Sequence, residues 1–99
     1  MNVKILSTQS VTADTTPGLI SLPDGLGGDT QVVFTFAPSR AVNVELRMTA
    51  SGGGHYIIPE DSALADNYTS PVFKAANAPL FVYAASSQAL TITVAQVIA

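Results

Sequence analysis

Apolar and polar side chains alternate strictly along residues 42–49, which read Val-Asn-Val-Glu-Leu-Arg-Met-Thr. Successive side chains of an extended strand point to opposite faces of a sheet. A period of two therefore places the four apolar residues on one face and the four polar residues on the other. The pattern predicts an antiparallel strand with one face packed on a core and the other face in water.

The same alternation marks residues 31–37, where Val32, Phe34 and Phe36 share a face, and residues 90–94, where Thr91 and Thr93 point outward. Five shorter segments also have extended character, at 2–6, 18–22, 56–58, 72–75 and 80–85. Turn residues recur every ten or so positions between these segments, and no segment has the length and period of a helix.

Three local features predict how the strands connect. Only the short link Pro38-Ser39-Arg40 separates 31–37 from the strand at 42–49, so we expect these strands to form a hairpin. Gly52-Gly53-Gly54 interrupts the alternation and predicts a break between strands. The phase of the alternation slips at Ala95-Gln96, which predicts a β-bulge there.

Seven or eight short strands in 99 residues predict an all-β fold, a single small β-sandwich domain covering residues 1–99. Strand spacing leaves both jelly-roll and immunoglobulin-like wiring open. Residues 7–17 are rich in Thr and Ser and have almost no apolar face, so we expect an extended arm or an edge strand there.

Charged residues make up only 11 % of the chain, less than half the usual proportion of about 25 %. A surface poor in ions suits a protein that packs against its own copies or a larger partner, although a monomer with Thr- and Ser-rich faces has the same composition. The net charge is −3, and the four basic residues are scattered. We therefore expect neither nucleic-acid nor membrane binding.

The chain has no cysteine, which excludes disulfides and thiolate metal ligands. Its first residues lack the apolar run of a signal peptide, and no stretch is long enough to span a bilayer. We expect a soluble protein made in the cytoplasm.

Candidate catalytic and metal-binding residues are few. His55 follows three glycines, where a loop histidine with one hydrogen bond is more common than a general base. Glu60, Asp61 and Asp66 form the densest acidic cluster but lack the alternation of a calcium loop, so a solvated loop is the better interpretation. The segment Asp24–Asp29 lacks a following Lys and is interpreted as a turn. We expect no enzyme activity, no cofactor and no metal.

Binding residues are easier to suggest. Tyr56 and Tyr68 flank the least regular region, where exposed rings can stack on sugars or cap the end of the core. Arg40 and Arg47 are candidates for contact with a partner because arginine is favoured at interfaces; pairing of Arg47 with Glu45 is the alternative.

The segment 80–85 is apolar on both faces, which indicates a core on one side and a neighbouring subunit on the other. We therefore expect an interface formed by four consecutive residues, Leu80, Phe81, Val82 and Tyr83.

The second half of the chain, in residues 51–59, Pro79-Leu-Phe-Val-Tyr-Ala-Ala85 and Ala89-Leu-Thr-Ile-Thr-Val94, resembles small virion proteins of tailed bacteriophages. The resemblance is closest in style to capsid decoration (cement) proteins and covers about half of the chain. It implies a homo-oligomeric β-protein that binds the outside of an assembled capsid. Its partner would be the major capsid protein or another virion protein, and its location the virion.

The sequence thus predicts a non-enzymatic phage structural protein that stabilises the capsid. Residues 80–83 would associate with other copies, and the N-terminal segment with Arg40 would contact the shell. The alternative is a carbohydrate- or receptor-binding β-sandwich module that uses Tyr56 and Tyr68.

Overall fold

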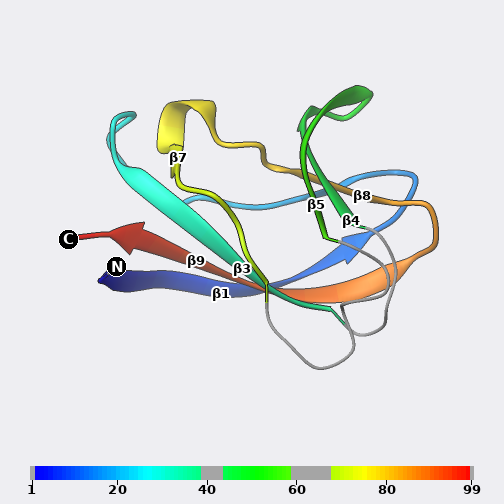
Figure 1. Ribbon diagram of the computed structural model, residues 1–99, viewed down its shortest axis with the longest axis horizontal. Coiled ribbons are helices and arrows are strands. Elements are labelled where there is room, and N and C mark those ends of the chain that lie inside the picture. Colours follow the sequence, from blue (N-terminus) through cyan, green and yellow to red (C-terminus); the bar gives the residue numbers. More distant parts are fainter. Residues whose placement is uncertain (1, 39–43, 59–67, 99) are drawn as a thin grey trace.

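The computed structural model describes the backbone of residues 2–38, 44–58 and 68–98, and the side chains of these residues except 38 and 53–58. The strands form two antiparallel sheets, here called sheet A and sheet B (Figure 1). The two ends of the described chain lie side by side, where the amide of Ile98 donates a hydrogen bond to the carbonyl oxygen of Asn2.

Sheet A contains the two longest strands. Its order is β1, β9, β3 and β6, and β7 also pairs with β3. The bounds are β1 (Val3–Ala13), β3 (Gln31–Pro38), β6 (Tyr68–Thr69), β7 (Phe73–Lys74) and β9 (Gln88–Val97). β6 and β7 pair with β3 one after the other, so they act as two halves of one interrupted strand.

Sheet B has the order β2, β8, β4 and β5. Its strands are β2 (Gly18–Leu19), β4 (Val44–Thr49), β5 (Gly52–Ile58) and β8 (Phe81–Ala84). One turn of 3₁₀ helix, η2 (Ala75–Asn77), follows β7 on the way back to this sheet.

Both sheets contribute to one apolar core, because alternation places every second residue of β3, of β8 and of the middle of β9 inside it, together with the end of β1 and the start of β4. The buried members of this core are Val11, Ala13, Ile20, Val32, Phe34, Phe36, Val44, Leu46, Ala78, Val82, Ala84, Leu90, Ile92 and Val94. The rings of Phe34 and Phe73, 6.1 Å apart between centroids, join β3 to β7 within it.

The chain changes sheet more often than the sequence suggests. β3 lies in sheet A and β4 in sheet B, so the predicted hairpin between them is wrong. A short link between strands is compatible with a hairpin or with a crossing from one sheet to the other. The inner faces of β3 and β4 are apolar in both arrangements. Residues 39–43 of the link lie outside the described part of the chain.

Two further local predictions need correction. The glycines at 52–54 do not separate strands but belong to β5, which pairs with β4. The irregular register lies on β1 and not on β9, since Ile5 pairs with Ala95 and Ser7 with Val94, which leaves Leu6 as the extra residue. Leu6 packs against the core from this position.

Residues 7–13, at the start of the predicted arm, belong to β1, and β1 is the outermost strand at one end of sheet A. The short segment expected at 2–6 is continuous with it. Asp14 follows the strand, and its carboxylate accepts a 2.7 Å hydrogen bond from the amide of Thr15.

Ser70 fills the interruption between β6 and β7. Its buried hydroxyl accepts a 2.9 Å hydrogen bond from the amide of Phe34 and donates to the carbonyl oxygen of Pro71, while its own amide donates to the carbonyl oxygen of Phe34. The side chain thus satisfies a backbone group in the middle of β3 that the interrupted strand does not reach.

Gly18 begins β2 directly against β1. A Cβ atom at this position would lie 2.4 Å from the carbonyl oxygen of Thr12 and 2.6 Å from Cγ1 of Val11. Only glycine permits this close approach of the two strands, which belong to different sheets.

We predict that Ser70→Ala lowers the free energy of unfolding by about 1–3 kcal/mol, because the buried amide of Phe34 loses its acceptor. Chemical denaturation measures the change. Ser86→Ala, at an exposed position, is the matched control and should change stability by less than about 0.5 kcal/mol. Equal effects of the two substitutions would contradict the role given to Ser70.

We also predict that Gly18→Ala destabilises the protein by about 1–3 kcal/mol, since the added methyl group must displace β1. Gly52→Ala is the control, because a Cβ there meets no atom within 4 Å. Thermal unfolding of both variants distinguishes the cost of the close approach from the general effect of replacing glycine. A Gly18→Ala protein as stable as the Gly52→Ala protein would show that β1 and β2 are not in contact.

Candidate functional site

The outward face of sheet B carries a small cluster of aromatic and charged side chains, here called the Arg47 cluster. Register places Glu45 opposite Tyr83 and Arg47 opposite Phe81, and Phe81 is in turn opposite Leu19. These five residues alternate with the buried ones of their strands, so they share the outer face. Leu19 is 57 % exposed, and the other four are half-buried.

Arg47 is held on two sides. Its Nε donates a 3.0 Å hydrogen bond to Oε1 of Glu45, and its guanidinium carbon lies 3.7 Å from the centroid of the Tyr83 ring. The ion pair balances the charge, and the ring supplies a cation–π contact. A side chain fixed in this way loses little conformational entropy when it binds a partner, which makes the Arg47 cluster a preorganised surface.

The four consecutive residues 80–83, which were expected to form an interface, differ in where their side chains lie. Val82 is fully buried in the core, so its inclusion is wrong: a side chain with 0 % exposure has no surface for a partner. Leu80 packs against the core. Phe81 and Tyr83 face outward beside Arg47, and Arg40 lies outside the described residues.

The outward face of sheet A, here called the sheet A face, has a different character. Because β1, β9 and β3 are in register, its outward residues form rows across the sheet. The outward positions of β1, β9, β3 and β6 are Val3, Ile5, Thr8, Ser10, Thr12, Ala89, Thr91, Thr93, Ala95, Val97, Gln31, Val33, Thr35, Ala37 and Thr69. None of them is charged, and Lys74 on β7, opposite Gln31, places one charge at the corner of this face.

One row of this face consists of four threonines from four adjacent strands. Thr8 on β1 is opposite Thr93 on β9, Thr93 is opposite Thr35 on β3, and Thr35 is opposite Thr69 on β6. The hydroxyl oxygens of Thr35 and Thr69 are 3.4 Å apart. The row was not predicted, although the outward Thr91 and Thr93 of the sequence pattern point to it.

An apolar groove of about 330 Å³ lies next to the threonine row. Ile5 and Val33 stand on either side of the small Ala95 in the neighbouring row, which leaves the hollow above Ala95. Val33 is only 2 % exposed, whereas Ile5 is 65 % exposed. A buried floor and a projecting wall are thus adjacent on one face.

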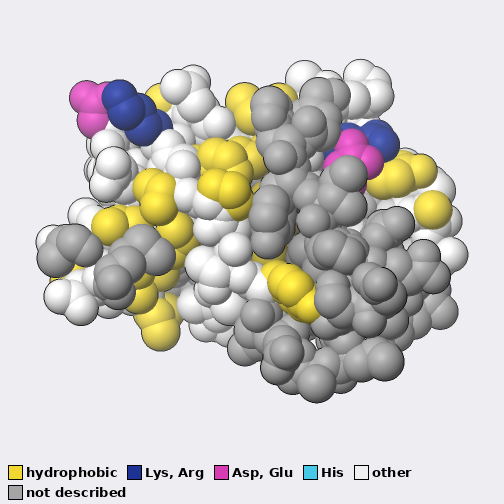
Figure 2. Space-filling model, in the orientation of Figure 1, with side chains coloured by type: hydrophobic (Ala, Val, Ile, Leu, Met, Phe, Trp, Pro, Cys, Tyr) yellow, Lys and Arg dark blue, Asp and Glu magenta, His cyan; other side chains and the backbone are white. Residues whose placement is uncertain are grey.

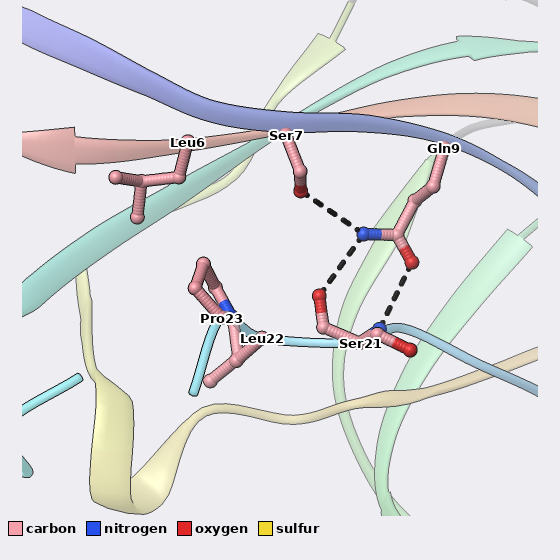
Figure 3. A pocket seen from close by; sticks show the side chains of 6 residues that line it. All are labelled: Leu6, Ser7, Gln9, Ser21, Leu22 and Pro23. Carbon is pink, nitrogen blue, oxygen red and sulfur yellow. Dashed lines mark hydrogen bonds between the residues drawn. The ribbon is translucent and has the colours of Figure 1, made fainter. Parts of the chain in front are cut away.

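A second hollow, of about 380 Å³, lies between β1 and residues 21–23 (Figure 3). The Gln9 carboxamide spans it: Nε2 donates to the carbonyl oxygen of Ser21 at 3.0 Å, and the Ser21 amide donates to Oε1 at 2.9 Å. This pair of hydrogen bonds imitates a strand pairing and links β1 to the segment after β2. Its polar groups are thus used within the chain, which indicates a structural role.

The remaining candidates from the sequence do not form a reactive centre in the described part. Glu60, Asp61 and Asp66 lie outside it, and His55 is described only by its backbone in β5. Gly25 adopts a φ of 78° in the segment Asp24–Asp29, as a turn requires, and Asp29 lies 3.8 Å from Nζ of Lys74. Among the described residues no three His, Cys, Asp or Glu side chains are grouped to hold a metal.

Of the two candidate tyrosines, the structure describes the side chain of Tyr68. Tyr68 is half-buried and packs against the core from β6. Tyr56 lies opposite Leu46 in β5, and its side chain is outside the description. The sequence pattern did not show that Tyr68 would face the core, because the segment around it is irregular.

Charge is sparse on the surface as well as in the composition. On the face that Figure 2 shows, the charged side chains of the described residues form two small groups at opposite ends. Among the residues that the structure describes, the ion pairs are Arg47–Glu45 and Lys74–Asp29. Lys74 lies on β7, at the corner of sheet A.

Within the described ranges no helix has the length and apolar character needed to cross a membrane. The chain matches no protein-family model, no curated protein and no solved structure.

We predict that Arg47 and Tyr83 are energetically coupled by about 0.5–1 kcal/mol, as expected for a partly exposed cation–π pair. A double-mutant cycle with Arg47→Ala and Tyr83→Leu, measured by denaturant unfolding, gives the coupling. The pair Arg47→Ala and Thr8→Ala, on opposite sheets, is the control and should be additive. An additive Arg47–Tyr83 cycle would show that the stacked geometry contributes nothing to stability.

Proposed function

We propose that this protein is a non-enzymatic structural protein of a bacteriophage virion, which binds the assembled capsid and stabilises it. The observation that carries the proposal is the Arg47 cluster, a preorganised aromatic and arginine surface on an open sheet face. Arginine and tyrosine are the residue types in which binding energy between proteins is concentrated. The main core residues are committed to holding the sheets together, which leaves the outer faces for function.

The strand order supports a jelly roll, the first of the two wirings expected. When β6 and β7 count as one strand, the first strand pairs with the last, the second with the second last and the third with the third last. The two central strands, β4 and β5, pair with each other. This is the pattern of one long antiparallel ribbon rolled into two sheets, which we infer to be a jelly-roll sandwich. Jelly rolls occur in viral capsid proteins and in lectins.

The sugar-binding alternative has less support. One ring face of Tyr83 is covered by the Arg47 guanidinium, and Tyr68 is packed against the core. Stacking on a sugar needs an open ring face. The Arg47 cluster suits a protein surface better, since its charge is already balanced by Glu45 and its desolvation costs less than that of a lone arginine.

Binding of many copies explains how a small module stabilises a shell. A face of this size gives a modest affinity for each contact, but a copy that touches two capsid subunits converts the second contact into an intramolecular one. The protein would then act at the junctions between subunits, where it opposes their separation.

We predict that the purified protein binds to capsids of the same phage and sediments with them. These capsids are first assembled from the major capsid protein in the absence of the purified protein. Arg47→Glu should weaken this binding about 10-fold or more, because the substitution removes the stacked guanidinium and places two carboxylates side by side.

Lys4→Glu makes the same change of charge on β1 and is the matched control, which should bind as the unchanged protein does. Circular dichroism shows that both variants are folded. Failure of the unchanged protein to sediment with capsids would refute the proposed function. Equal weakening by both substitutions would refute the role of the Arg47 cluster.

A further inference from the structure

We propose that the sheet A face is a self-association surface, on which two copies pack face to face about a two-fold axis with Ile5 of each copy seated in the groove of the other. This inference deepens the proposed function and rests on it for its purpose, although pairing in solution requires no capsid. The partner is therefore a second copy of this chain.

The face is complementary to itself. A two-fold interface brings the same patch of both copies together, so a projection and a hollow must lie beside each other on one surface. Ile5, which is 65 % exposed, projects beside the hollow, and Val33 and Ala95, at 2 % and 4 % exposure, form the floor of the hollow. An Ile5 side chain from the second copy would fill the hollow and bury its own apolar surface, which water now covers.

Charge also favours a second copy. The protein carries a net charge of −3, and two copies repel each other through most approaches. On β1, β9, β3 and β6 the sheet A face has no charged outward residue, and Lys74 on β7, opposite Gln31, brings a single charge to its corner, so pairing over these four strands desolvates no charge. A highly charged partner would gain nothing from this face.

The threonine row fits the same partner. A hydroxyl group both donates and accepts a hydrogen bond, so a row of hydroxyls is compatible with an identical row facing it. Thr8, Thr93, Thr35 and Thr69 extend across four strands and lie next to the groove. Their short side chains also allow two sheets to approach closely.

A stable pair would need a substantial share of the surface of so small a protein. A standard interface buries about 800 Å² per partner, which is about 15 % of the 5273 Å² accessible surface of this protein. The sheet A face consists of the outward residues of the longest strands. Both its apolar rows and its hydroxyl rows would lie in the interface.

Pairing through sheet A has a consequence for the capsid. The Arg47 clusters of the two copies would point in opposite directions, away from the two-fold axis. A pair standing between two capsid subunits would therefore contact both of them, one through each sheet B. In this arrangement the dimer is bivalent and links two capsid subunits. It also reverses the sequence expectation, since the N-terminal strand joins copies and the strand at 80–83 contacts the shell.

Analytical ultracentrifugation of the full chain over a range of concentrations, without capsid, tests the inference. We expect a mass of twice 10.2 kDa at high concentration and dissociation on dilution. Ile5→Lys should weaken the pairing about 10-fold or more. Met48→Lys introduces the same charge at an exposed apolar side chain on β4 of sheet B, outside the Arg47 cluster, and should leave the pairing unchanged.

Far-UV circular dichroism confirms that both variants fold, and Thr93→Lys serves as a second variant on the sheet A face. An unchanged protein that remains a single chain at submillimolar concentration would overturn the inference, as would pairing that Ile5→Lys does not weaken or that Met48→Lys weakens equally. Because no capsid is present, this failure is distinct from a failure of capsid binding.

Discussion

The apolar core shared by the two sheets is the constraint on which the other features depend. Phe34, Phe36, Leu46 and Ile92 are buried in it from both sheets, so the direction of every neighbouring side chain is fixed by alternation. Thr35 must point away from the core because Phe34 and Phe36 point into it. In the same way Arg47 must lie on the outer face because Leu46 is inside, which brings it over the ring of Tyr83.

Alternation was therefore the most informative part of the sequence. It predicted the strands at 31–37 and 90–94 and their buried residues, and the all-β class agrees with the two antiparallel sheets. It did not decide which side of the strand at 80–83 faces the core, since both sides are apolar there. The buried Val82 and the outward Tyr83 differ only because of what packs against them.

Long-range pairing was beyond the sequence for a physical reason. After β3 the chain could either form a hairpin or cross to the other sheet, and the choice depends on strands far away in the sequence. In this protein β3 pairs with β9 rather than with β4. The extra residue at Leu6 and the close contact at Gly18 likewise arise from tertiary packing. The Arg47 cluster could not be predicted because it depends on the register between β4 and β8, which brings Tyr83 next to Arg47. The sequence did suggest the pairing of Arg47 with Glu45 as an alternative.

The two outer faces give the protein two different contact chemistries. One combines an apolar groove with uncharged hydroxyl rows, and the other holds an arginine between a carboxylate and a ring. In the proposed account the first joins copies and the second holds the shell. A cryo-electron microscopy reconstruction of capsids carrying the protein tests this most directly. The account predicts density for paired copies, with β1 and β9 at the contact between them and β4 and β8 against the capsid subunits. Single copies bound with both sheet faces open to solvent would contradict it.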